Sequence, residues 1–171
     1  TWEDPTGGLA ETGSDRTDAA FLWLPYPDPD GRFTHVTVAE EPRLVALPAA
    51  HALADRPEIA FDDLLDEPFL ALPAGSGPLR DHWLATAERG GRPVRVGAEI
   101  ASTEETAEAL EAGLGICLLA RGNVPLVKRA SVVFRPVTGV SPSTLVLAWR
   151  ADDERPLLTA LRRAVREVVS R

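Results

Sequence analysis

Strand-like and helix-like segments alternate along the middle of this 171-residue chain, and this alternation constrains its fold more than any other feature. Short apolar runs bounded by proline or glycine indicate strands, and apolar residues recurring every three or four positions indicate helices. The expected strands are 18–24, 33–38, 43–47, 69–72, 94–100, 115–120, 132–137 and 144–149, and the expected helical segments are 61–65, 79–89, 102–113 and 154–169. This order predicts an α/β protein with βαβ units and a mainly parallel sheet covered by helices on both sides.

The clearest helix start in the sequence is the run from Ser102 to Glu105. Ser102 followed three positions later by Glu105 fits a capping box, in which the serine and glutamate side chains satisfy free backbone N–H groups of the first turn. Gly113 suits the end of this helix, because glycine readily adopts the left-handed conformation found just beyond a helix C-terminus.

Two further segments show a helical apolar face. In the expected helix 79–89 this face contains Leu79, Trp83 and Ala87 at four-residue spacing. The closing helix 154–169 has a longer face, formed by Leu157, Leu161, Ala164, Val165 and Val168.

Composition argues against several classes of protein. The net charge is −8 and the pI is about 4.9, whereas a domain that grips DNA usually presents a basic face, so this chain alone is not expected to bind nucleic acid. Cys117 is the only cysteine and is expected to be a buried structural residue. The three histidines have no metal-ligand spacing, and no apolar run is long enough to span a bilayer. The N-terminus does not resemble a signal peptide, so we expect a cytoplasmic protein. We also expect no cofactor, metal or membrane partner.

Seven short segments, taken in order, resemble the effector-binding domain of LysR-type transcription regulators. No single motif is decisive, and the resemblance rests on their order and spacing from about Trp2 to Val169. The segments are 41–48 (EPRLVALP), 51–54 (HALA) and 63–69 (DLLDEPF), then 102–105 (STEE) and 112–116 (AGLGI), then 133–137 (VFRPV) and 145–150 (LVLAWR).

This resemblance implies the fold of type 2 periplasmic binding proteins, in which two crossing strands join two α/β lobes. Lobe I would comprise residues 1–42 and 143–171, and lobe II residues 43–142. The family's winged helix-turn-helix, linker helix and first strand and helix of lobe I precede the matched segments, so lobe I is expected to be incomplete. DNA contact is expected only through that helix-turn-helix domain, and pairing into a homodimer is implied.

The resemblance also implies the function of a regulatory domain that binds a small organic effector, expected to be anionic, in the cleft between the lobes without catalysis. Ser102 and Thr103 are candidate contacts, because backbone N–H groups at a helix N-terminus attract carboxylates. The alternative for Ser102 is simple capping. Gly75 and Ser76, in a loop leading to another helix, are candidates because glycine lets the backbone approach a ligand closely. This loop can equally be an ordinary flexible connection.

Two more candidates come from the positions that the resemblance gives them. Trp23 lies in the lobe I strand that borders the cleft, where an indole can stack on a ring of the effector, although a place in the core is the alternative. Arg43 lies at the first crossing between the lobes and can pair with a carboxylate through two hydrogen bonds. A solvated arginine at a strand end is the alternative.

Two other functions stay open on the same fold. One is a solute-binding protein of a transport system, and the other is an enzyme such as a prephenate dehydratase-like domain. The sequence has no Thr-Arg-Phe motif, no nucleophile with an evident base and no phosphate-binding glycine fingerprint, which favours binding over catalysis.

Overall fold

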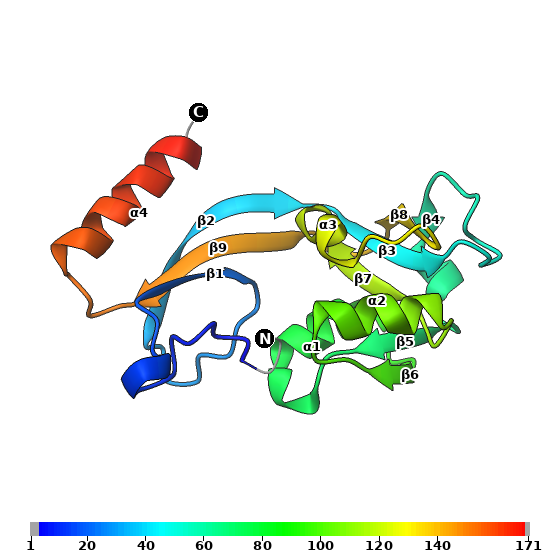
Figure 1. Ribbon diagram of the computed structural model, residues 1–171, viewed down its shortest axis with the longest axis horizontal. Coiled ribbons are helices and arrows are strands. Elements are labelled where there is room, and N and C mark those ends of the chain that lie inside the picture. Colours follow the sequence, from blue (N-terminus) through cyan, green and yellow to red (C-terminus); the bar gives the residue numbers. More distant parts are fainter. Residues whose placement is uncertain (1–3, 170–171) are drawn as a thin grey trace.

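The computed structural model describes residues 4–169, so Trp2, where the resemblance begins, lies outside the described residues. The chain forms two bodies side by side, connected by long strands (Figure 1). The strands are β1 (Ala19–Trp23), β2 (Phe33–Glu41), β3 (Arg43–Pro48), β4 (Ile59–Ala60), β5 (Pro68–Ala71), β6 (Arg95–Glu99), β7 (Cys117–Ala120), β8 (Val132–Thr138) and β9 (Ser143–Arg150). The α-helices are α1 (Pro78–Trp83), α2 (Thr103–Glu111), α3 (Val124–Val127) and α4 (Pro156–Val169), and the 3₁₀ helices are η1 (Gly13–Asp15), η2 (Phe61–Leu64), η3 (Ala74–Ser76), η4 (Thr86–Arg89) and η5 (Arg121–Asn123).

Lobe I, as we call the first body, is a three-stranded sheet in the order β1-β9-β2 with α4 beside it. Both strand pairs are antiparallel, and Leu22 faces Val146 in the register of β1 with β9. One face of the sheet packs against Leu9, and the other face meets α4 mainly through Leu158. Lobe I therefore has two small cores rather than one large one.

Lobe II, the second body, has a larger sheet with apolar layers on both faces. Four strands run in the order β4-β8-β3-β7, and a parallel bridge between Phe69 and Ile116 joins them to β5 and β6. Side chains alternate across a strand, so Val45 of β3 joins one core while Leu44 joins the other. The helix α2 covers the second core with Leu110. This two-sided packing gives lobe II most of the buried apolar residues of the chain.

The prediction of a mainly parallel sheet is wrong. Of the strand pairs in the described residues, β1–β9, β2–β9, β3–β7 and β3–β8 are antiparallel, and only β4–β8 and β5–β6 are parallel. The strand–helix alternation holds only between β5 and β7, where α1 and α2 act as crossovers. Elsewhere the chain passes from lobe I to lobe II along β2 and β3 and returns along β8 and β9. These two passages run in opposite directions, which makes their strand pairs antiparallel.

The single helix expected over 79–89 is interrupted. The helix α1 ends at Trp83, and Ala85 adopts the left-handed conformation with φ of 51° before η4 begins. The side chain of Arg89 turns inward, where its Nε donates to the Leu84 carbonyl at 2.9 Å and its guanidinium lies 4.6 Å from the centre of the Phe69 ring. These contacts with the preceding turn and with β5 accompany the break, which helical periodicity does not reveal.

The serine half of the capping box of α2 is confirmed, and the glutamate accepts the N–H one residue before the cap. The Ser102 hydroxyl accepts the Glu105 N–H at 3.1 Å, and the Glu105 carboxylate accepts the Ala101 N–H at 2.7 Å. Gly113 has a φ of 67°, which is the left-handed conformation expected just beyond the helix.

The apolar face expected on the closing helix is largely uncovered. Leu158, which is not part of that face, is buried, whereas Leu157 and Val168 are 83% and 70% exposed. The helix extends away from the end of the lobe I sheet (Figure 1). It contacts the sheet through Leu158, Val165 and Arg162, whose guanidinium lies 4.5 Å from the centre of the Trp149 ring. In the described part of the chain, no helix is both long and apolar enough to cross a membrane.

Candidate functional site

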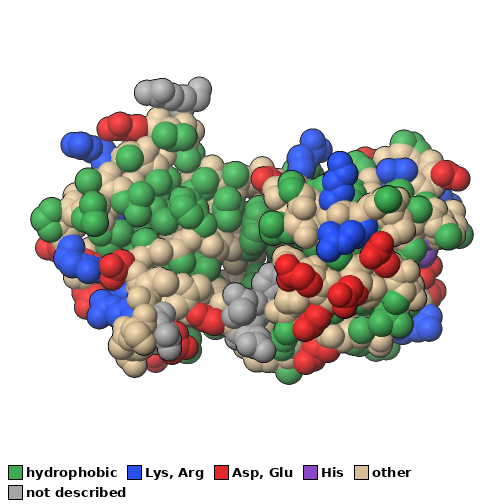
Figure 2. Space-filling view, viewed as in Figure 1, with side chains coloured by type: hydrophobic (Ala, Val, Ile, Leu, Met, Phe, Trp, Pro, Cys, Tyr) green, Lys and Arg blue, Asp and Glu red, His purple; other side chains and the backbone are tan. Residues whose placement is uncertain are grey.

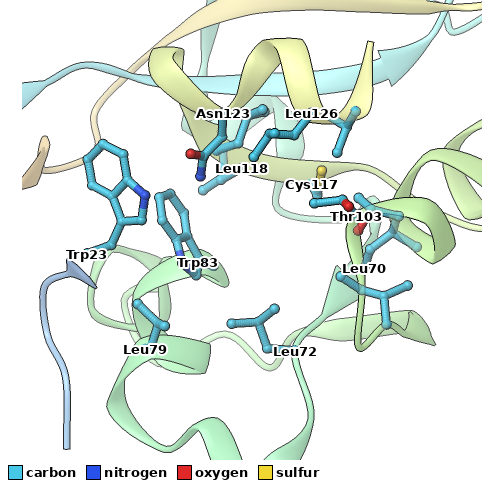
Figure 3. A pocket seen from close by; sticks show the side chains of 14 residues that line it. Trp23, Leu70, Leu72, Leu79, Trp83, Thr103, Cys117, Leu118, Asn123 and Leu126 are labelled. Atoms are coloured by element: carbon cyan, nitrogen blue, oxygen red, sulfur yellow. The ribbon is translucent and has the colours of Figure 1, made fainter. Parts of the chain in front are cut away.

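A cavity of about 110 Å³ is lined by residues of lobe II and by Trp23 of β1 in lobe I. Helices α1, α2 and α3 and strands β5 and β7 surround it, and Trp23 reaches it from β1 (Figure 3). Most of its wall is aliphatic, with side chains from several elements that meet only in the folded protein: Leu70, Leu72, Leu79, Ile100, Leu118 and Val127.

Two indole rings from different lobes close one end of this cavity. Trp23, at the end of β1, and Trp83, at the end of α1, pack edge to face with ring centres 6.2 Å apart and an interplanar angle of 77°. Figure 3 shows the two rings side by side at the edge of the cavity. A molecule that contacts both rings contacts both lobes.

The polar groups of the cavity are few and uncharged. The Thr106 hydroxyl donates to the Ser102 carbonyl at 2.7 Å, and the Thr103 hydroxyl donates to the Glu104 carboxylate at 2.9 Å. The Asn123 carboxamide has no hydrogen-bond partner among the described residues, and Figure 3 shows it at the cavity near Trp83. Asn123 therefore keeps its donor and acceptor capacity for a bound molecule.

Cys117 also lines the cavity, but its thiol is unreactive. Burial raises the pKa of the Cys117 thiol to about 12. The thiolate is the nucleophilic form, so this cysteine acts as a small apolar group, as expected from the sequence.

The N-terminus of α2 is closed by its own side chains. The Ser102 hydroxyl takes the Glu105 N–H of the first turn, and the Glu105 carboxylate takes the Ala101 N–H just before the helix. Hydrogen bonds from the backbone N–H of Glu104 and from the Thr103 hydroxyl lower the pKa of the Glu104 carboxyl, which places a second carboxylate at this end. Two carboxylates therefore occupy the place where an anionic ligand was expected.

A buried polar network lies where the chain crosses between the lobes. The Arg43 side chain is 1% exposed. Its guanidinium donates to the Ser141 carbonyl at 2.6 Å, the His82 carbonyl at 2.5 Å and the Glu88 carboxylate at 2.5 Å. Ser141 lies in the loop before β9, which returns to lobe I, and Arg43 begins β3. This network joins both crossing segments to the α1–η4 region.

Two titratable groups of this network have strongly shifted pKa values. Burial and, to a smaller extent, the positive charge of Arg43 together lower the pKa of His82 to about 4. Burial raises the pKa of Glu88, but hydrogen bonds from the Ser141 N–H and hydroxyl and the nearby Arg43 charge outweigh it, so the pKa falls to about 2. At neutral pH His82 is neutral and Glu88 is charged.

The residues predicted from the sequence fall into two groups. Trp23 and Thr103 line the cavity, and Ser102 adjoins it as the cap of α2. Gly75 and Ser76 lie in η3, away from the cavity lining, and the donor groups of Arg43 are used within the protein. Arg43 is therefore placed at the crossing as expected but does not face the cavity.

Sequence reasoning missed Trp83 and Asn123. The four-residue spacing of Leu79 and Trp83 gave a signal for a shared face, which we interpreted only as a helix packing face. Asn123 had no signal, because η5 reaches the cavity through tertiary packing. Within residues 4–169, no group of three or more His, Cys, Asp or Glu side chains is placed to hold a metal ion.

Comparisons with known proteins agree with this architecture. The curated relative "HTH-type transcriptional regulator XapR" of Escherichia coli (strain K12) is 25% identical over 146 residues, which are 83% of this chain and 48% of XapR. The chain thus spans about half the length of this relative.

Solved structures of two regulators have the same fold. The effector binding domain of a BenM variant matches with a TM-score of 0.73 and 22% identity, over 90% of this chain and 71% of that one. The BenM effector binding domain with its effector benzoate matches with a TM-score of 0.68 and 21% identity, over 90% and 69%. The reduced OxyR regulatory domain from Pseudomonas aeruginosa matches with a TM-score of 0.65 and 27% identity, over 90% and 72%.

These likenesses establish the two-lobed fold for the described chain. The family model described as "LysR substrate binding domain" matches residues 3–170, which is nearly the whole sequence. The chain belongs to the LysR substrate-binding domain family.

Proposed function

We propose that this domain senses a small molecule in the cavity beside Trp23 and Trp83 and thereby regulates a LysR-type transcription factor. The observation that carries the proposal is the contact between these two rings, because it joins β1 of lobe I to α1 of lobe II at the cavity edge. We assign residues 1–42 and 143–171 to lobe I and residues 43–142 to lobe II.

Binding at this cavity would shift the equilibrium between different arrangements of the two lobes. A molecule in contact with both rings has a higher affinity for the lobe arrangement in which the rings are together than for one in which they are apart. This difference in affinity increases the population of the first arrangement. The Arg43 network at the crossing strands would set the preferred arrangement in the free protein.

The relatives support regulation rather than transport or catalysis. XapR is a helix-turn-helix transcription regulator, and the BenM domain is solved with its effector. We propose that DNA contact occurs through a helix-turn-helix domain outside this sequence, that two chains pair as a homodimer, and that the protein works in the cytoplasm without turning over its ligand.

A thermal-shift screen tests the proposed function. The domain is heated with a panel of aromatic and aliphatic acids, amides, amino acids and sugars, and a ligand that binds only the folded state raises the midpoint with its concentration. We expect at least one such compound, with a smaller effect in Trp83→Leu. The matched control is Thr159→Ala, at an exposed position of α4, which should behave as the unchanged domain.

A folded domain whose midpoint responds to none of these compounds would contradict the proposal. So would a ligand whose effect is the same in Trp83→Leu and in the unchanged domain, because that ligand would bind elsewhere.

A further inference from the structure

We infer that the effector of this domain is an uncharged molecule with a single aromatic ring and one neutral polar group, rather than the anion expected from the sequence. This inference rests on the proposed function and names the class of ligand that the same cavity accepts. Three observations carry it: the chemistry of the wall, the state of the nearby helix N-terminus and the free carboxamide of Asn123.

The wall of the cavity offers no charge to balance a charged ligand. The fourteen described residues that line it include no Lys, Arg, His, Asp or Glu. An ionised carboxylate moved from water into such a place loses its hydration without gaining a partner, and that loss is far larger than for a neutral group. Arg43 was the cation expected to pair with a ligand carboxylate, but its guanidinium donates to Ser141, His82 and Glu88 instead.

The N-terminus of α2 does not supply the missing positive charge. In its first turn the Ser102 hydroxyl takes the Glu105 N–H, and the Glu104 carboxylate accepts its own backbone N–H. The Glu105 carboxylate takes the Ala101 N–H just before the helix. An anionic ligand would have to approach two negative side chains and displace their hydrogen bonds. The electrostatics at this end of the cavity therefore disfavour anions.

Asn123 is the group suited to a neutral ligand. Its carboxamide offers one acceptor and two donors, and no hydrogen bond to the described residues uses them. Amide, hydroxyl and carbonyl groups are complementary to it without carrying charge. The indole rings of Trp23 and Trp83 nearby give a ring the edge-to-face or offset packing that aromatic pairs prefer.

The size of the cavity sets the size of the ligand. A dry apolar cavity of ~150 Å³ in a protein interior accepts benzene. The cavity of about 110 Å³ here is of the same order, and it is partly open to solvent. One ring with a short substituent that extends toward Asn123 fits this space.

Three probes of nearly identical shape test the class of ligand. Benzamide is neutral, benzoate is an anion and benzamidine is a cation, and each is titrated into the domain at pH 7.5 with tryptophan fluorescence or calorimetry as the readout. We expect benzamide to bind at least tenfold more tightly than benzoate and benzamidine. Trp83→Leu should weaken benzamide binding at least fivefold, and the exposed-surface control Thr159→Ala should leave it unchanged.

A variant that introduces a charge makes the test sharper. Asn123→Lys places a cation at the cavity, so the preference should move from benzamide toward benzoate, while Asn123→Leu should weaken benzamide without strengthening benzoate. The half-buried position of Asn123 makes these changes compatible with folding, which circular dichroism checks.

The outcomes separate this inference from the proposed function. Equal or tighter binding of benzoate or benzamidine to the unchanged domain overturns the neutral class but leaves an effector-binding domain. Binding of none of the three overturns the single-ring class, and the wider panel described above then decides the proposed function independently.

Discussion

Lobe II buries apolar side chains on both faces of its sheet, whereas lobe I leaves much apolar surface uncovered. The lobe II cores contain fully buried residues such as Val45, Phe69 and Leu110. In lobe I, Phe21 and Leu157 are 59% and 83% exposed. Figure 2 shows hydrophobic side chains gathered over the part of the surface that β2, β9 and α4 occupy, while charged side chains intersperse the lobe II surface.

This difference indicates how the two lobes obtain their stability. Lobe II has the two-sided packing that a sheet needs to exclude water on its own. Lobe I has one sheet of three strands and a helix attached by few contacts, so part of its apolar surface stays exposed to solvent. The cavity lies on the well-packed lobe, and lobe I contributes one residue, Trp23, to it.

The largest expected effect compares one helical leucine from each lobe. Leu110→Ala in α2 removes a side chain with no exposure, and we expect it to lower the free energy of unfolding by about 4 kcal/mol, since it loses buried surface and leaves a cavity. Leu157→Ala in α4 should change it by less than about 0.5 kcal/mol, because that side chain already contacts water. Urea denaturation of both variants measures the contrast. Equal losses would show that the α4 face is covered in solution.

The crossing network should give the next largest effect. Arg43→Met leaves Glu88 without its cation in a partly buried place, and we expect a loss of about 3 kcal/mol. Adding Glu88→Gln should recover part of that loss, so a double-mutant cycle by urea denaturation measures the coupling. Additive effects would contradict a direct interaction across the crossing.

The same network predicts a dependence of stability on pH. The pKa of His82 is about 4 in the folded protein against an ordinary value of 6.5, so below pH 6.5 the unfolded chain binds a proton that the folded protein does not. Stability should fall by about 1–2 kcal/mol as pH falls from 6.5 to 4, allowing for partial exposure of the ring. Glu88, with a pKa of about 2 against 4.5, adds a further loss between pH 4.5 and 2.

The control for this pH dependence is His82→Gln. This variant removes the group that titrates between pH 6.5 and 4, so its stability should vary less over that window in the same denaturation series. An unchanged slope would mean that other groups cause the effect.

The smallest expected effect concerns the cap of α2. Ser102→Ala removes the acceptor of the Glu105 N–H, and we expect a loss of about 1 kcal/mol in the free energy of unfolding. Ser102→Asn should restore most of it, because asparagine also caps well. A thermal midpoint for Ser102→Ala equal to that of the unchanged domain would show that this end of the helix is satisfied by other groups.

Local signals in the sequence predicted most elements of the fold. The capping box at Ser102, the turn at Gly113 and the apolar run of β1 depend on neighbours within a few residues, so short patterns reveal them. Strand direction depends on where distant segments return, and the passages between the lobes made the parallel prediction fail. The break at Ala85 is accompanied by contacts of Arg89 with Leu65 and Phe69, which are distant in the sequence.

The candidate site was predicted only where a single element determined it. Thr103 follows a recognisable helix start, and Trp23 ends a recognisable strand, so both could be proposed. Trp83 and Asn123 reach the cavity from α1 and η5 through tertiary packing. Arg43 was expected to bind a ligand because sequence does not show that Ser141, 98 positions away, would use its donor groups.

Nuclear magnetic resonance of the indole N–H groups tests the central claim most directly. The chain has four tryptophans, and Trp23→Phe and Trp83→Phe variants assign the two signals at the cavity. On titration with benzamide, or with any ligand found by the thermal-shift screen, the signals of Trp23 and Trp83 should move together with one dissociation constant, while that of Trp149, buried in lobe I, should stay in place. Binding that leaves both cavity signals unmoved would contradict an effector site between the two lobes.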